Sequence, residues 1–136
     1  MQSAVDYNQL ADVAARGADA FVETFYKLWD TQRHLLIRLY KDTTPILFNG
    51  MPFSGGSSFE EHYQRLPATV HEIQSYDCHP LYFGQERADI VITVTGIVKF
   101  GASVGRPFSE TFLLTPETDP GKKGTYFIGS DCRRFV

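Results

Sequence analysis

The segment Ala88-Asp-Ile-Val-Ile-Thr-Val-Thr-Gly-Ile-Val-Lys-Phe100 decides the fold. β-branched and aromatic residues such as these suit a pleated strand better than a helix. The two alternating sets are Ile90, Ile92 and Val94 on one face, and Val91, Thr93 and Thr95 on the other. A strand with one apolar and one semi-polar face belongs to a sheet whose core covers a single side.

Three further segments have the same strand character, namely residues 70–83, 108–115 and 125–135. The connections 101–105 and 116–124 are too short for helical crossovers, which need about a dozen residues or more. We therefore expect long strands that pair antiparallel.

Two helices are predicted before the first strand. Apolar residues recur at helical spacing from residue 5 to residue 29. Asp30 can cap a second helix, in which Arg33, His34 and Arg38 are expected to lie mostly in solvent.

A short hairpin and a third helix follow. Asn49-Gly50, between a short strand at 43–48 and its return strand, is a strong signal for a tight hairpin turn. The third helix is expected to begin at a capping serine, Ser57 or Ser58, and to end at Pro67.

The order of these elements predicts the fold class. Helix, helix, short hairpin, helix and four strands make an α+β domain, in which three N-terminal helices pack on one face of an antiparallel sheet. The chain has 136 residues, a usual size for one domain. Because no linker or repeat divides it, we expect a single domain over residues 1–136.

Composition and charge limit the partners. The formal net charge is −3 and the pI about 5.7, whereas direct binding to nucleic acid needs a basic surface. No run approaches the roughly 18 apolar residues of a membrane span, and the N-terminus has no signal-peptide pattern. Cys78 and Cys132 are the only cysteines. We expect an intracellular protein without metal, cofactor, membrane contact or nucleic-acid binding of its own.

A catalytic role would need acid and base groups in a cavity under the helices. The residues that could supply them are Tyr40, Asp42, His62, Tyr63 and Asp131. No two carboxylates, and no histidine with an aspartate, stand at a spacing that would pair them. We therefore expect no enzymatic activity.

The last strand is more informative about function. If Phe127 and Phe135 face the core, Cys132 and Arg134 must share the outer face. The same outer face receives Thr93, Thr95, Ser109, Thr111 and Leu113. Small, hydroxylated side chains with one cation make a smooth surface, which is either a solvated sheet face or a protein interface.

Eight short motifs occur in order along nearly the whole chain. They are Arg38-Leu-Tyr40, Phe48-Asn-Gly50, Phe53-Ser-Gly55, Leu66-Pro67, Asp77-Cys-His-Pro80, Gly96-x-Val-Lys-Phe100, Thr111-Phe-Leu-Leu114 and Ser130-Asp-Cys-x-Arg-Phe135. In this order they resemble the nuclear transport factor 2 family. The motifs that begin at Asp77 and Ser130 are most similar to its export branch.

The resemblance implies a cone-like fold with a strongly bent sheet. Export-branch members are the small subunit of the heterodimeric mRNA export receptor, and their sheet packs against the homologous domain of the large subunit. By resemblance, Asp77 and Arg134 make ion pairs across that interface. The implied function is a non-catalytic adaptor in mRNA export, found in the nucleus, the nuclear pore and the cytoplasm. The heterodimer is expected to bind Phe-Gly repeats of nuclear pore proteins.

The fold also allows three different functions. The first is import, since import-branch members are homodimers that carry the GDP-bound Ran GTPase through acidic contacts. Here Asn49 replaces one of those acids, and residues 101–103 contain none. The second is a Phe-Gly-peptide-binding module, and the third is a cavity enzyme of the isomerase or dehydratase type.

Arg133 departs from the family pattern, which has an aromatic core residue between Cys132 and Arg134. Either its stem packs against apolar side chains while its charge reaches the cavity mouth, or the alternation of faces slips at the end of the strand.

Overall fold

The computed structural model describes residues 7–82, 88–122 and 124–136, without the side chains of 7–13 and 122. Its elements are α1 (Tyr7–Thr31), the 3₁₀ helix η1 (Arg33–Leu39), β1 (Pro45–Phe48), β2 (Met51–Ser54), α2 (Gly56–Tyr63), β3 (Thr69–Tyr82), β4 (Ala88–Phe100), β5 (Arg106–Pro116), the 3₁₀ helix η2 (Pro120–Lys122) and β6 (Tyr126–Phe135). This order confirms the α+β class. The expected first helix residues 5 and 6, and strand residue 83, lie outside the described residues.

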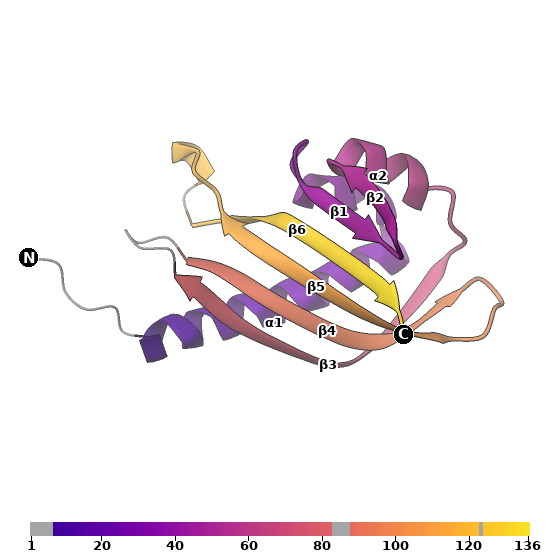
Figure 1. Cartoon of the computed structure of the whole chain (residues 1–136), viewed down its shortest axis with the longest axis horizontal. Helices are drawn as coiled ribbons and strands as arrows, with labels where there is room; N and C mark the ends of the chain where they lie inside the picture. Colours follow the sequence, from indigo (N-terminus) through magenta and orange to yellow (C-terminus); the bar gives the residue numbers. More distant parts are fainter. Residues whose placement is uncertain (1–6, 83–87, 123) are drawn as a thin grey trace, which may run out of the picture.

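The strands form one six-stranded sheet in the order β2-β1-β6-β5-β4-β3 (Figure 1). β3, β4, β5 and β6 pair antiparallel as expected. β1 and β6 run parallel, however, with Ile46 opposite Asp131 and Phe48 opposite Arg133. The prediction of a purely antiparallel sheet is therefore wrong. The long stretch of chain between β1 and β6 serves as a crossover, which permits parallel pairing.

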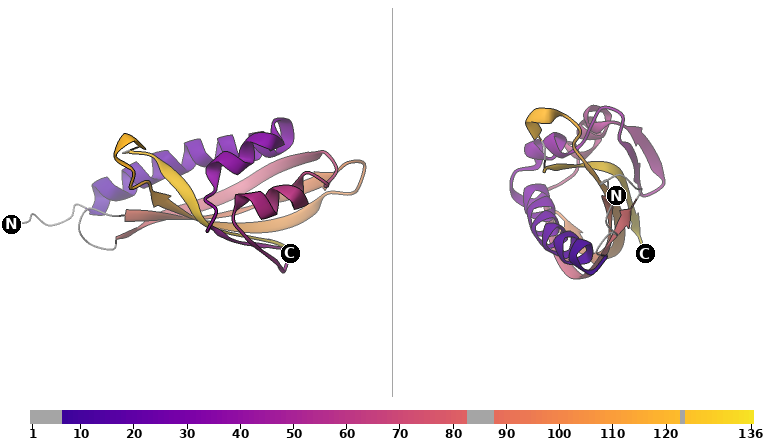
Figure 2. Two further views of the ribbon diagram at one scale, coloured as in Figure 1. Left: turned by 90° about the horizontal axis from the view of Figure 1, so that it is seen from above. Right: turned by 90° about the vertical axis from the view of Figure 1, so that its left-hand side faces the viewer.

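Helix α1 covers the inner face of the sheet. Its buried side chains recur every three or four residues at Ala14, Ala18, Val22, Phe25, Tyr26 and Trp29. The ring centroid of Phe25 lies 4.7 Å from that of Phe112 in β5. Figure 2 shows the sheet curving around α1, which lies behind the sheet in Figure 1. None of the helices in the described part of the chain is long and apolar enough to cross a membrane.

The helices do not form one N-terminal group of three. η1 is a 3₁₀ helix, and α2 comes after the β1–β2 hairpin. That hairpin turns at Asn49 and Gly50 as predicted, with φ angles of 52° and 89°. Since the hairpin stands between η1 and α2, only α1 and η1 are consecutive in the chain.

The predicted helix caps are wrong. The N-cap of η1 is Gln32, which makes no side-chain capping bond, because the Asp30 carboxylate bonds to β3 instead. The N-cap of α2 is Gly55, whose φ of 86° favours glycine. The Ser58 hydroxyl donates back to the Ser54 carbonyl at 2.9 Å.

Arg33 is half-buried, in contrast to its expected position in solvent. Its guanidinium donates to the carbonyl oxygens of Tyr63, Leu66 and Pro67 at 3.0, 2.7 and 2.8 Å. These carbonyls lie at the last residue of α2 and just beyond it, where the end of a helix leaves acceptors outside its own hydrogen-bond ladder. Arg33 therefore ties the start of η1 to the end of α2.

The alternation in β4 is confirmed, whereas the expected direction of Phe127 in β6 is wrong. Ile92 is fully buried and Thr93 is exposed. In β6 the register shifts, so that Leu113 pairs with Ser130 but Leu114 pairs with Ile128. This β-bulge reverses the alternation. Ile128 takes the core position, and Phe127 lies 4.8 Å from Lys41 Nζ.

Candidate functional site

The outer face of the sheet carries all eight residues that were predicted to bind a partner. One row across the strands reads Asp77, Thr93, Thr111 and Cys132. The next row reads Thr95, Ser109 and Arg134, and Leu113 stands in a third row beside Val91 and Ser130. Ser109 and Leu113 are half-buried and the other six residues are exposed. Antiparallel pairing thus gathers these residues on one face, which Figure 1 shows without a helix over it.

Asp77 and Arg134 carry opposite charges on this face. They stand on β3 and β6, three strand spacings or roughly 14 Å apart. Neither forms an ion pair with any residue in the described ranges. Such a face can therefore accept a carboxylate at one end and a cation at the other.

Arg133 lies inside the protein, so its charge does not reach a cavity mouth, which was one of the two alternatives considered for it. Its side chain is 1% exposed. Nε and Nη2 both lie 2.9 Å from Glu110 Oε1, and Tyr26 donates to the same oxygen at 2.7 Å. The guanidinium also lies 4.8 Å from the Phe108 ring centroid and 5.0 Å from that of Trp29. Burial acts to lower the pKa of Arg133, but the charge of Glu110, together with those of Tyr26 and Asp131 and the hydrogen bond to Glu110, raises that pKa overall.

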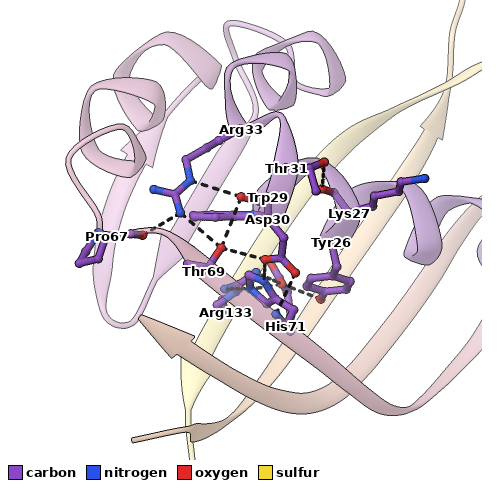
Figure 3. Close-up of polar contacts among 11 residues, drawn as sticks. Tyr26, Lys27, Trp29, Asp30, Thr31, Arg33, Pro67, Thr69, His71 and Arg133 are labelled. Atoms are coloured by element: carbon purple, nitrogen blue, oxygen red, sulfur yellow. Dashed lines mark hydrogen bonds and ion pairs between the residues drawn. The ribbon is translucent and has the colours of Figure 1, made fainter. Parts of the chain in front are cut away.

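An aspartate–histidine pair, Asp30 and His71, joins α1 to β3 next to Arg133 (Figure 3). Arg133 Nη1 can only donate, so His71 Nε2 accepts from it at 2.9 Å. The Nδ1 atom must then carry the proton, and it donates to Asp30 Oδ1 at 2.6 Å. Burial, together with the Arg133 charge, lowers the pKa of His71 and keeps the ring neutral. Although burial opposes it, hydrogen bonds from His71 and Thr69 lower the pKa of Asp30.

The sequence alone does not reveal this pair, because 41 residues separate its members. An aspartate at the end of one helix is predicted to cap the helix that follows. The strand pattern does not indicate which helix residue faces His71. A further hydrogen bond, from the His71 backbone N–H to Asp30 Oδ2 at 2.9 Å, fixes the same carboxylate on β3.

The residues considered for acid–base chemistry do not come together as a set. Tyr40 donates to Asp131 Oδ2 at 2.6 Å, and both are buried. Burial and then the Glu110 charge raise the pKa of Asp131 well above its usual range. Asp42 is exposed, and His62 packs between Phe48 and Phe53.

A groove of about 600 Å³ between α1 and β3 reaches the Asp30–His71 pair. The His71 side chain is nevertheless 0% exposed, and both ring nitrogens are engaged by Asp30 and Arg133. No nitrogen of this ring is free to exchange a proton with a molecule in the groove. In the described part of the chain, no three His, Cys, Asp or Glu side chains cluster as a metal site requires.

Known proteins match the chain along most of its length. The nuclear transport factor 2 (NTF2) domain family matches residues 17–135. "NTF2-related export protein 1" of Bos taurus is 33% identical over 98% of this chain and 96% of its own length. "Nuclear transport factor 2" of Dictyostelium discoideum is 35% identical over 85% of this chain and 87% of its own.

Solved structures also match the fold. A chain in the structure of Chaetomium Mex67:Mtr2 subunits superposes with a TM-score of 0.73 at 20% identity, covering 88% of this chain and 97% of that one. The six-stranded sheet, its long covering helix and the match over residues 17–135 agree. This chain belongs to the nuclear transport factor 2 domain family.

Proposed function

We propose that this chain is a non-catalytic adaptor subunit that supports export of mRNA through nuclear pores. It would do so by pairing with the NTF2-like domain of a large mRNA export receptor. The observation that carries the proposal is the exposed outer face, on which the charges of Asp77 and Arg134 have no ion-pair partner among the described residues. Thr, Ser and Cys side chains between these charges allow a second sheet to approach closely.

The names of relatives support the export branch. A full-length relative at 33% identity is named an NTF2-related export protein. The fold also occurs in the Mex67:Mtr2 assembly, whose two named subunits are structurally characterised together. Under this proposal the protein moves between nucleus, nuclear pore and cytoplasm, and the pair of subunits binds Phe-Gly repeats.

The interior supports a role without catalysis. The Asp30–His71 pair is the kind of arrangement that serves as a general base in enzymes. Here Arg133 occupies the second ring nitrogen at 2.9 Å. We infer that these buried groups hold α1, β3 and β6 together and that they do not act on a substrate.

A Ran-GDP import carrier is the second candidate, because the Dictyostelium relative named nuclear transport factor 2 is 35% identical. Two turns lack the acidic side chains that such a carrier needs. Asn49 is hydrogen-bonded to β6. Its backbone N–H donates to the Arg133 carbonyl at 2.7 Å, and its side-chain Oδ1 accepts from the Phe135 backbone N–H at 3.3 Å. The turn at 101–103 offers no carboxylate, so both positions lack the charge that Ran's basic residues would need.

Titration calorimetry with two probes separates the candidates. The first probe is the NTF2-like domain of the large export receptor from the same organism, and the second is GDP-bound Ran. We expect tight binding to the first and none to the second. Micromolar or tighter binding of Ran together with no binding of the receptor domain would replace export by import.

A further inference from the structure

The core contains two carboxyl groups beside one guanidinium. Glu110 on β5 is 2% exposed and Asp131 on β6 is 3% exposed. In the β5–β6 ladder Glu110 stands opposite Arg133, and Phe112 stands opposite Asp131. Glu110 and Asp131 are therefore diagonal neighbours on the inner face, a separation of roughly 7–8 Å that long side chains can bridge.

Hydrogen-bond donors are unevenly distributed between these two carboxyl groups. Glu110 Oε1 accepts from the Tyr26 hydroxyl at 2.7 Å and from Arg133 Nε at 2.9 Å. Asp131 Oδ2 accepts from the Tyr40 hydroxyl at 2.6 Å. Asp131 Oδ1 is also buried, but it has no hydrogen-bond donor among the described residues. An ionised oxygen in that position would lose its hydration without a compensating bond.

The charges around Asp131 do not balance if both carboxyl groups are ionised. The titratable side chains that face it are Tyr26 of α1, Tyr40 beyond η1, Glu110 of β5 and Arg133 of β6. β1 places the apolar Ile46 opposite Asp131. The neutral His71 ring of β3 lies behind the guanidinium, 2.9 Å from Arg133 Nη1. Two carboxylates would then face one cation, whereas a single proton on the pair makes the group neutral.

We propose that Asp131 and Glu110 share one proton at neutral pH, held on Asp131 Oδ1 and donated to Glu110, and that this proton is a pH-sensitive lock within the core. A protonated carboxyl group has one O–H donor, so the proton gives Oδ1 a partner and removes the excess charge. Asp131 is the proton carrier because Glu110 Oε1 already accepts from Tyr26 and Arg133.

The direction of the Asp131 pKa agrees with this arrangement. Burial and then the Glu110 charge raise that pKa, and a side-chain hydrogen bond with Glu110 acts in the same direction. The bond from Tyr40 and the Arg133 charge act against it, without reversing it.

The lock joins segments that are far apart in the chain. Tyr40, which precedes β1, pairs with Ile128 in an isolated parallel bridge and donates to Asp131. The shared proton then links Asp131 on β6 to Glu110 on β5. Loss of the proton at alkaline pH would leave two facing carboxylates, whose repulsion should loosen this part of β6. The inference does not depend on the proposed function.

The lock has a consequence that can be counted in protons. A pKa that is higher in the folded chain than in the unfolded chain stabilises the fold fully below about pH 3.9, and this contribution is lost as pH rises through the folded pKa. Between these two pKa values the folded chain holds a proton that the unfolded chain releases.

The test unfolds the chain at pH 7 in weakly buffered urea and measures proton release with a pH indicator. Wild type should release about one proton more than Asp131→Asn. Asp42→Asn, which removes an exposed carboxylate, is the matched control and should release as many protons as wild type. Equal release by wild type and Asp131→Asn would overturn the proposal.

Infrared spectroscopy of the folded chain at pH 7 gives a second readout that needs no substitution. The carbonyl stretch of a protonated carboxyl group is separate from the bands of carboxylates, and it should shift when aspartate is labelled with ¹³C at its side-chain carboxyl. Absence of this band would also overturn the proposal.

Glu110→Gln distinguishes a shared proton from protonation by burial alone. Without Glu110, Arg133 has Asp131 as its remaining acidic neighbour among the groups named above, so Asp131 should ionise and the infrared band should disappear. Melting curves check that each variant folds. A band that persists unchanged in folded Glu110→Gln would show that Glu110 does not share the proton.

Discussion

Replacing the buried Arg133 by methionine should strongly destabilise the isolated chain. The change leaves Glu110, which is 2% exposed, with Tyr26 as its remaining hydrogen-bond donor. It also leaves His71 Nε2 without the donor that now lies 2.9 Å away. Removing one partner of a buried ion pair costs about 3–5 kcal/mol. A domain of this size has about 5–15 kcal/mol in total, so the loss is a large part of its stability.

The neighbouring arginine provides a matched control. Arg134→Met removes the same group from the opposite, exposed face, where a surface charge contributes about 0–1 kcal/mol. Urea denaturation followed by circular dichroism gives both free energies of unfolding. The double variant Arg133→Met, Glu110→Leu removes both charges and should recover much of the loss, because an apolar pair can replace a buried ion pair. Equal stability of the two single arginine variants would refute the buried pair.

Two further predictions concern the same interior. Because burial lowers the pKa of His71, the unfolded state, with a pKa near 6.5, takes up a proton that the folded state does not. The free energy of unfolding should therefore fall as pH drops below about 6.5, by at most about 1.4 kcal/mol per pH unit from this group. His71→Gln should flatten that slope in urea titrations repeated at several pH values. An unchanged slope would assign the pH dependence to another group. The raised pKa of Asp131 gives the opposite pH dependence. The contribution of Asp131 to the stability of the fold is complete below about pH 3.9 and is lost as pH rises. Asp131→Asn, which retains an acceptor for Tyr40, should therefore raise the melting temperature at pH 7 but not at pH 3, and a lower melting temperature at pH 7 would contradict the assignment.

The sequence was sufficient for much of the fold and for the exposed face. Alternation in β4 and β6 determines which side chains point outward, and short connections determine antiparallel pairing. Together they placed Thr93 and Arg134 on one face, because side chains alternate along a strand where no bulge intervenes, and the bulge of β6 lies before Ser130. Export-branch motifs then added Asp77, which alternation alone had not singled out.

The remainder depended on contacts between residues far apart in the chain. Parallel pairing of β1 with β6 follows from a long crossover, whose direction no local pattern determines. The bulge opposite Leu113 and Leu114 reversed Phe127 and Ile128 without a clear signal in the sequence. Burial of Arg133 depends on Glu110 in the adjacent strand, which pairs with it in register.

The dissociation rate of the complex with the receptor's NTF2-like domain tests the central claim that the outer face is a protein interface. Arg134 has no ion-pair partner within the described residues, so its loss should not change the melting curve of the free chain. Arg134→Ala should cost about 2–5 kcal/mol of binding, mainly through faster dissociation, because it leaves a partner carboxylate buried without its cation. Arg134→Glu should dissociate faster still, since like charges would then oppose each other. An Arg134→Glu complex that dissociates at the wild-type rate would contradict the interface.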